Sequence, residues 1–223
     1  SYPDWQGIVY PKSKPQGFSE LEYYSKYFNL VEINSSFYKI PSTNTAQTWS
    51  NVTYNNNPQF QFLVKLWNKF THSAPFLDKS KIDQFKNAFS LLRKEQFAGL
   101  LVQFPWSFKY EQTNLSYILE LAEAFTEFNI CVEVRHGSWD NSNVLKEFIK
   151  HQITFVNIDQ PIIGHSITRT KHSTSTIGYI RLHGRNEQAW FNEQSGRDAR
   201  YNYLYSNQEL DEWYEFITSS AQN

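Results

Sequence analysis

The sequence predicts an α/β fold, a closed parallel (β/α) barrel of the TIM type, and three observations support this. Six short apolar runs recur along the 223 residues, and each closes with ionic or amide side chains at alternate positions. Segments with helical spacing separate the runs, and strands that alternate with such helices pair in parallel through right-handed crossovers. No glycine-rich dinucleotide fingerprint or phosphate-binding loop follows any run.

The predicted strands become polar on one face. Because successive strand side chains point to opposite faces, Val132 and Val134 share an apolar face, and Glu133 and Arg135 share a polar one. An open doubly wound sheet also fits the alternation, but it needs apolar side chains on both faces of its central strands. A barrel accounts for the asymmetry, because its inner face turns polar at the carboxyl ends, where ligands bind. The predicted strands are residues 30–34, 62–65, 100–103, 131–135, 156–159 and 180–183.

The predicted helices fall between these strands and often open on Ser, Thr or Asn, which cap helix N-termini. They are residues 19–29, 44–52, 79–94, 112–128, 141–151 and 208–218. Two long excursions interrupt this rhythm. Residues 160–177 are rich in Thr, Ser and His and contain Pro161 and Gly164, so they predict a loop. Residues 184–205 form the second excursion, and such segments commonly carry binding residues.

Composition predicts a single domain over residues 1–223, since nothing resembling a linker divides the chain. A net charge of -1 and a pI near 6.6 argue against nucleic acid as a partner. No run approaches the roughly 20 apolar residues of a membrane span, and no signal peptide opens the chain, so we expect no membrane partner and a cytoplasmic location. The lone Cys131 excludes an internal disulfide and a cysteine-based metal cage. The lack of Met indicates a processed or partial chain.

Several blocks of the sequence also resemble one family. These are SYPDWQG at residues 1–7, VEINSSFY at 31–38, LVQFP at 101–105, VEVRH at 132–136 and RLHGR at 181–185. Together they resemble the domain of unknown function 72 family, also called YecE-like. The resemblance implies a TIM-type barrel and no particular activity. Members usually carry one strand before the first block and another strand and helix at the end, so the first and last barrel strands are expected to be missing from this chain.

The candidate catalytic residues are Glu133, His136, Asp159 and His183. Glu133 and Arg135 lie two residues apart on one strand, roughly 6.6 Å, so they can form an ion pair or hold two ends of one ligand. His136 follows on the turn, and an imidazole beside a carboxylate suits proton transfer. Asp159 and His183 end the next two strands and are expected to approach Glu133 across the barrel mouth. A structural ion pair or a fully satisfied polar plug is the alternative.

The candidate substrate-binding residues are the other polar and aromatic groups at the same strand ends. Arginines can hold an anionic group, and flat rings suit the stacking of sugars or other rings. Lys65 also raises the possibility of a Schiff-base lysine, although a cation for substrate charge is the preferred interpretation. The residues are Glu32, Asn34, Tyr38, Lys65, Gln103, Arg135, Trp139, Asn157, Arg181, Arg185 and Trp190.

These residues predict an acid/base enzyme, a hydrolase, isomerase or lyase, acting on a small polar substrate that is anionic or sugar-like. No cofactor is expected. No close-spaced metal-ligand motif occurs, and Arg135 and Arg181 would oppose a dication, so no metal is expected either. Two alternatives stay open. One is a metal-dependent endonuclease-like phosphodiesterase, suggested by Arg185, Arg197 and Arg200 in the second excursion. The other is a ligand-binding barrel without catalysis, which full mutual pairing of the ionic groups would favour.

Overall fold

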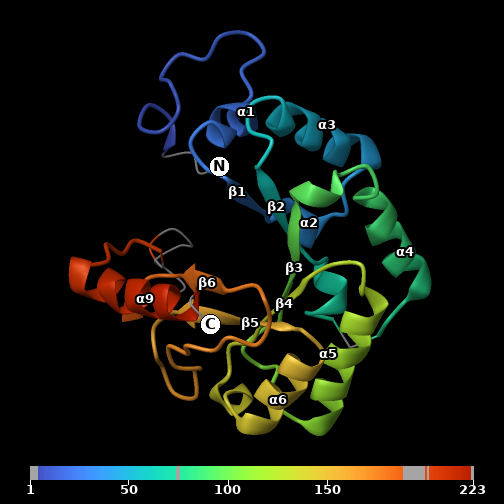
Figure 1. The fold of residues 1–223 in the computed structure, drawn as a ribbon, viewed down its shortest axis with the longest axis vertical. Coiled ribbons are helices and arrows are strands. Elements are labelled where there is room, and N and C mark those ends of the chain that lie inside the picture. Colours follow the sequence, from blue (N-terminus) through green and yellow to red (C-terminus); the bar gives the residue numbers. More distant parts are fainter. Residues whose placement is uncertain (1–4, 74–75, 188–198, 200, 222–223) are drawn as a thin grey trace. The chain divides into compact units, whose positions relative to one another are not determined.

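The computed structural model describes residues 5–73, 76–187, 199 and 201–221, and its elements follow the predicted alternation of strands and helices (Figure 1). All six predicted strands and all six predicted helices are confirmed as elements, although the helices predicted at 19–29, 79–94 and 112–128 end four to six residues earlier, at Ser25, Ala88 and Ala124. The described residues belong to two compact units. The first unit lies within Ser1–Asn68 and Leu77–Gly99, and the second within Lys69–Phe76 and Leu100–Asn223.

The first unit is built on two parallel strands. β1 (Leu30–Ile33) pairs with β2 (Gln61–Lys65) so that Ile33 lies opposite Val64. Phe60, Phe62 and Phe85 are completely buried and supply much of its core. Side chains cap its longer helices, since Ser42 accepts from the N–H of Thr45 and Asp78 from that of Lys81. Its helices are α1 (Glu20–Ser25), α2 (Ser35–Tyr38), α3 (Thr43–Tyr54), α4 (Lys79–Ala88) and a 3-10 turn at Lys94–Gln96.

The second unit carries the remaining strands. β3 (Phe97–Gln103), which begins in the sequence range of the first unit, pairs with β4 (Ile130–Glu133). β5 (Thr154–Asp159) and β6 (Tyr179–Leu182) follow, and every described pair is parallel. Leu101, Val132 and Phe155 of these strands are buried. The helices are α5 (Gln112–Ala124), α6 (Ser142–Lys150) and α9 (Asn207–Ser220), with 3-10 turns at Asn68–Phe70, which crosses the boundary between the units, and Gly137–Trp139.

Within each unit the strand order follows the chain order, β1-β2 in the first and β3-β4-β5-β6 in the second. Parallel strands in chain order with intervening helices are the arrangement of a TIM-type barrel, and this confirms the predicted α/β fold class. Residues 160–177 contain no helix or regular strand, as predicted, and a single bridge joins Ser166 to His136. The single-domain assignment stays a prediction beside these two units. Within the described ranges no helix is both long and apolar enough to cross a bilayer.

Candidate functional site

A group of charged side chains lies in the second unit at the carboxyl ends of β4 and β6. Its centre is Glu133, the last residue of β4, which lies opposite Gln103 of β3 in the parallel register. Arg135 follows two residues later, while Arg181 belongs to β6 and His183 comes directly after it. These four ionisable residues, Glu133, Arg135, Arg181 and His183, are named the Glu133 cluster. Their convergence was predicted from the alternation along each strand.

The two arginines hold both oxygens of Glu133. Arg135 Nε donates to Glu133 Oε1 at 2.6 Å, and Arg181 Nη1 donates to Glu133 Oε2. The remaining nitrogens of Arg135 reach Gln160 Oε1 at 3.1 Å and His183 Nε2 at 3.2 Å. The Glu133 side chain is 0% exposed, whereas those of Arg135 and Arg181 are 14% and 15% exposed. A buried carboxylate therefore anchors two cations that still reach solvent.

The surroundings of Glu133 keep it ionised. Burial raises the pKa of its carboxyl group, but the charges of Arg135 and Arg181 outweigh this effect, and the pKa falls to about 2. A carboxylate this weakly basic is a poor general base near neutral pH, and it carries no proton to donate. Glu133 is therefore better suited to anchoring the arginines than to the predicted acid/base role.

His183 is the member of the cluster suited to proton transfer. A guanidinium can only donate, so Arg135 donates to His183 Nε2, and the neutral imidazole carries its proton on Nδ1. His183 Nε2 is also 3.8 Å from Glu133 Oε1, which becomes an ion pair only when the imidazole is protonated. The acid/base role of His183 stays a prediction.

β5 turns its apolar side chains toward the Glu133 cluster. The register pairs Ile158 with Arg181, and residues paired across neighbouring strands point to the same face. Gln160 shares that face and accepts a hydrogen bond from the cluster. Asn157 and Asp159 alternate with these positions and lie on the opposite face. The prediction that they approach Glu133 is wrong, because the expected polar face of this strand points the other way.

Asn157 serves the loop that follows β5. Its Oδ1 accepts from the backbone N–H of His172 at 2.8 Å, and its Nδ2 donates to the carbonyl of the same residue at 2.8 Å. His172 Nε2 lies 2.8 Å from Asp140 Oδ1. Asn157 is buried, so this pair of bonds satisfies its amide and ties the 160–177 loop to β5. Its expected contact with substrate has no support from these bonds.

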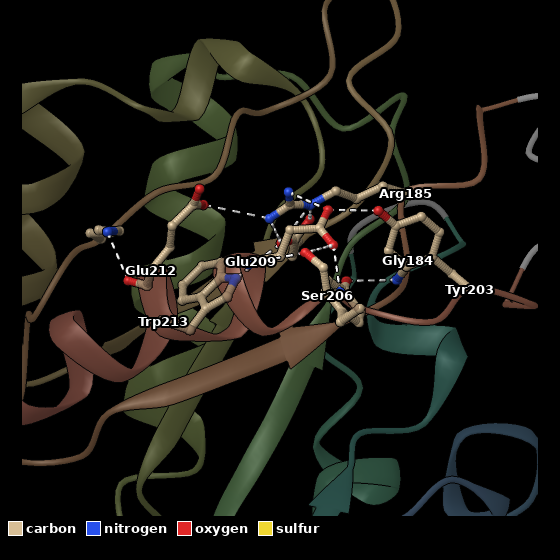
Figure 2. Close-up of polar contacts among 10 residues, drawn as sticks. Gly184, Arg185, Tyr203, Ser206, Glu209, Glu212 and Trp213 are labelled. Carbon is tan, nitrogen blue, oxygen red and sulfur yellow. Dashed lines mark hydrogen bonds and ion pairs between the residues drawn. The ribbon is translucent and has the colours of Figure 1, made fainter.

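A second group of polar contacts joins β5 to α9 (Figure 2). It consists of Asp159, Arg185, Glu209 and Trp213 and is named the Asp159 cluster. Arg185 Nε and Nη2 donate to the fully buried Asp159 at 3.0 and 2.7 Å, and Trp213 Nε1 donates to it at 3.0 Å. Arg185 Nη1 also donates to Glu209 at 2.7 Å. The hydrogen bonds to Asp159 raise the pKa of Arg185. A Tyr203 hydroxyl bond and the cap at Ser206 lower the pKa of Glu209 to about 2. These contacts tie Arg185 to both acidic partners, and its predicted contact with substrate stays a prediction.

A glycine turn connects the two clusters. Gly184 has φ +82°, and a Cβ there would come within 2.7 Å of Tyr203 Cβ, so the position requires glycine. Its N–H donates to Tyr205 Oη at 2.9 Å, and the N–H of His183 donates to the Asp159 carbonyl at 2.8 Å. The turn therefore holds the residue after β6 in one position and directs Arg185 to Asp159.

His136 lies just beyond β4. Its Nδ1 accepts from the Ser138 N–H at 3.2 Å and lies 2.8 Å from Ser138 Oγ, so the neutral ring carries its proton on Nε2. Burial, with smaller effects from Lys109 and His165, lowers the pKa of His136. The imidazole is therefore neutral at pH 7. Its predicted acid/base role is compatible with this state and stays a prediction.

Four predicted binding residues lie in the first unit. Lys65 ends β2 and places its ammonium group 4.1 Å from the centroid of the Phe37 ring. Glu32 lies in the middle of β1, Asn34 is exposed directly before α2, and Tyr38 is 69% exposed at the end of α2. Their contribution to a site with residues of the second unit stays a prediction.

Trp139 is a core residue, and its predicted contact with substrate is wrong. It is completely buried, its ring stacks on Phe108 at 5.4 Å between centroids, and its Nε1 donates to the Phe108 carbonyl at 2.7 Å. The exposed tryptophan beyond the carboxyl end of a strand is instead Trp106, which is 45% exposed. Trp190, Arg197 and Arg200 lie outside the described residues.

Sequence reasoning missed Gln160, Glu209 and Trp213. Gln160 follows the predicted strand by one residue and shares the face of Ile158, so a reversed assignment of faces on that strand would have found it. Glu209 lies three residues after Ser206 in a capping box that the sequence displays. Trp213 is an aromatic residue in a polar helix, a signal for a buried anchor. Among the described residues, no three His, Cys, Asp or Glu side chains are grouped to hold a metal ion.

The second unit defines a parallel β/α protein of the barrel class with a charged cluster at the carboxyl ends of its strands. The chain belongs to the family described as protein of unknown function DUF72, whose model matches residues 1–223, and this confirms the predicted resemblance. It is similar to the UPF0759 protein YunF of Bacillus subtilis strain 168, with 29% identity covering 98% of this chain and 81% of that protein.

Two solved structures resemble the chain. A DUF72 family protein from Thermotoga maritima MSB8 shares 30% identity with a TM-score of 0.83, covering 100% of this chain and 85% of its own. A DUF72 family protein from Enterococcus faecalis V583 shares 24% identity with a TM-score of 0.82, covering 92% of this chain and 78% of its own, and supports the fold alone. These relatives support the fold and do not name a reaction.

Proposed function

We infer that this protein is an enzyme that binds a small anionic substrate through Arg135 and Arg181 and moves a proton with His183. The observation that carries this proposal is the pair of guanidinium groups anchored on one buried carboxylate beside an imidazole. Because Glu133 stays ionised, both cations are fixed before a ligand arrives. Preorganised charges of this kind stabilise a developing anion without reorganisation.

Arg135 retains capacity for a ligand. A guanidinium has five N–H donors, and the described partners of Arg135 are Glu133, Gln160 and His183. In the described contacts, one N–H of Nη1 remains for a hydrogen bond to a ligand, and the side chain is 14% exposed to solvent. A phosphate or carboxylate oxygen is the acceptor that best matches such a donor. His183 contacts the same guanidinium group through Nη2, and the proton that it would move to the substrate is the one on its Nδ1.

The alternative is a ligand-binding protein without catalysis. The observation that favours it is the pairing of both Glu133 oxygens with arginines, which leaves this carboxylate no atom to act on a substrate. Both functions share anion binding and differ only in turnover. The endonuclease-like alternative receives no support from a grouped metal-ligand set among the described residues.

Titration calorimetry with inorganic phosphate and with a panel of small carboxylates and sugar phosphates tests the proposal. We expect Arg181→Gln to lose about tenfold or more in affinity, the scale of one charge-assisted hydrogen bond. Arg169→Gln is the matched control, because Arg169 is exposed in the same unit. Equal binding by wild type and Arg181→Gln would refute the anion site. Turnover of a bound panel member that is lost in His183→Asn supports the enzyme, and binding without turnover supports the alternative.

A further inference from the structure

Trp106 is exposed in a way that core packing does not explain. It is 45% exposed, whereas the other tryptophans described in the second unit, Trp139 and Trp213, are 0% and 4% exposed. It follows the last residue of β3, Gln103, by three positions, so it lies beyond the carboxyl end of that strand. A large flat ring left in contact with water at this end of a parallel sheet suits stacking on a ligand.

The ring of Trp106 lies against a fixed imidazole. Trp106 and His136 are 5.2 Å apart between ring centroids with an interplanar angle of 63°, and His136 is 5.8 Å from His165. Ser138 holds His136 by its N–H and its hydroxyl, and Ser138 Oγ in turn accepts from the N–H of Tyr110 at 2.8 Å. These hydrogen bonds hold the imidazole in one orientation against the indole.

The aromatic group adjoins the Glu133 cluster along the chain. Arg135 and His136 are consecutive residues, so their Cα atoms are about 3.8 Å apart. Phe104, two residues before Trp106, donates its backbone N–H to the carbonyl of Glu133 at 2.9 Å. This backbone bond fixes the start of the loop that carries Trp106 to the strand that carries the arginine anchor.

We propose that Trp106, His136 and His165 form a subsite for a planar ring, so that the substrate is an anionic compound carrying such a ring, as in a nucleoside monophosphate. The inference rests on the proposed function, since the arginines supply the site for the anionic group. Lys109 is exposed near His136 and adds positive charge beside the group. Aromatic rings and cations together favour a compound that carries both a flat ring and a negatively charged group.

Binding of three probes separates the two subsites. Adenosine 5′-monophosphate carries ring and phosphate, ribose 5-phosphate carries the phosphate alone, and adenosine carries the ring alone. With the wild type we expect the nucleotide to bind about tenfold or more tightly than ribose 5-phosphate, the scale of one base stacked on one aromatic side chain. Trp106→Leu should lower nucleotide affinity to that of ribose 5-phosphate and leave ribose 5-phosphate unchanged.

Two further variants complete the design. Trp106→Phe keeps a ring and should retain most of the preference for the nucleotide, which distinguishes stacking from loss of apolar bulk. If Trp106→Leu does not fold, the wild-type comparison of the nucleotide with ribose 5-phosphate still tests the ring subsite. Tyr214→Ala is the matched control, because Tyr214 is 66% exposed on α9, and it should change nothing.

The failures can be told apart. Equal affinity of the wild type for the nucleotide and ribose 5-phosphate, or a preference that survives Trp106→Leu, overturns the ring subsite and leaves the anion site standing. Phosphate binding that is insensitive to Arg181→Gln overturns the proposed function. In that case, adenosine binding that disappears in Trp106→Leu still supports the ring subsite, and absence of adenosine binding overturns both.

Discussion

Replacing Glu133 by glutamine removes the one carboxylate that the Glu133 cluster is built on. The amide keeps the size of the side chain, so little cavity forms. What changes is charge, because Arg135 and Arg181 lose the group that holds both of them. The expected outcome is a large loss of stability in a protein whose fold is otherwise the same.

The pKa of Glu133 sets the size of the effect. A carboxyl pKa lowered from 4.5 to about 2 corresponds, at about 1.4 kcal/mol per unit, to about 3 kcal/mol of interaction with the ionised form. Removal of one partner of a buried ion pair typically costs about 3–5 kcal/mol. The arginine side chains are 14% and 15% exposed and regain some hydration, which favours the lower end. A loss of about 3 kcal/mol lowers the Tm of a protein of this size by about 6–12 °C.

Urea unfolding followed by circular dichroism measures this loss. We expect Glu133→Gln to lower the midpoint without changing the slope, because the surface exposed on unfolding is unchanged. Glu123→Gln is the control, since Glu123 is exposed on α5 in the same unit, and it should stay within about 0.5 kcal/mol of wild type. A Glu133→Gln loss below about 1 kcal/mol would refute the reasoning, because the carboxylate would then not be the anchor of the arginines.

Three other predictions concern Glu133, Trp213 and Asn157. The folded pKa of Glu133 is depressed, so its contribution to stability is present above the unfolded value of 4.5 and is lost as pH falls toward about 2. Wild type should therefore lose more stability than Glu133→Gln between about pH 5 and 2 in acid unfolding, and parallel curves would contradict this. Trp213→Phe removes a donor to buried Asp159 and should cost about 1–3 kcal/mol, with faster amide exchange along α9. Asn157→Ala removes two bonds to the backbone of His172 and should speed exchange in residues 160–177, so an unchanged rate there counts against the proposed tie.

The fold was predictable because each strand carries its own signal. Apolar runs with period-two alternation and caps such as Ser42 and Ser206 are local, and the structure keeps them as local features. The convergence of Glu133 with Arg181 followed as well, because polar residues at the carboxyl ends of parallel strands meet at one edge of the sheet.

The orientation of β5 could not be predicted from its pattern. All six of its residues are buried, so both faces are covered and alternation does not say which face points toward the neighbouring charges. Asp159 is tolerated on the far face because Arg185 and Trp213 satisfy it there, and those partners lie 26 and 54 residues away in sequence. The burial of Trp139 and the exposure of Trp106 could not be predicted either, because both follow a strand within a few residues. Only the structure shows that Trp139 stacks on Phe108 in the core while Trp106 stays exposed.

The segment from Arg181 to Arg185 explains how one stretch of chain serves two buried carboxylates on opposite faces. Arg181 points to Glu133 from within β6, whereas Arg185 reaches Asp159 after the left-handed residue Gly184 has interrupted the extended backbone. Without that turn, residues four apart would continue on one face of the strand. His183 lies between the two arginines, and the backbone bond from its N–H to the Asp159 carbonyl holds it beside Arg135. The Asp159 cluster therefore supports the Glu133 cluster by fixing the residue on which its proposed proton transfer depends.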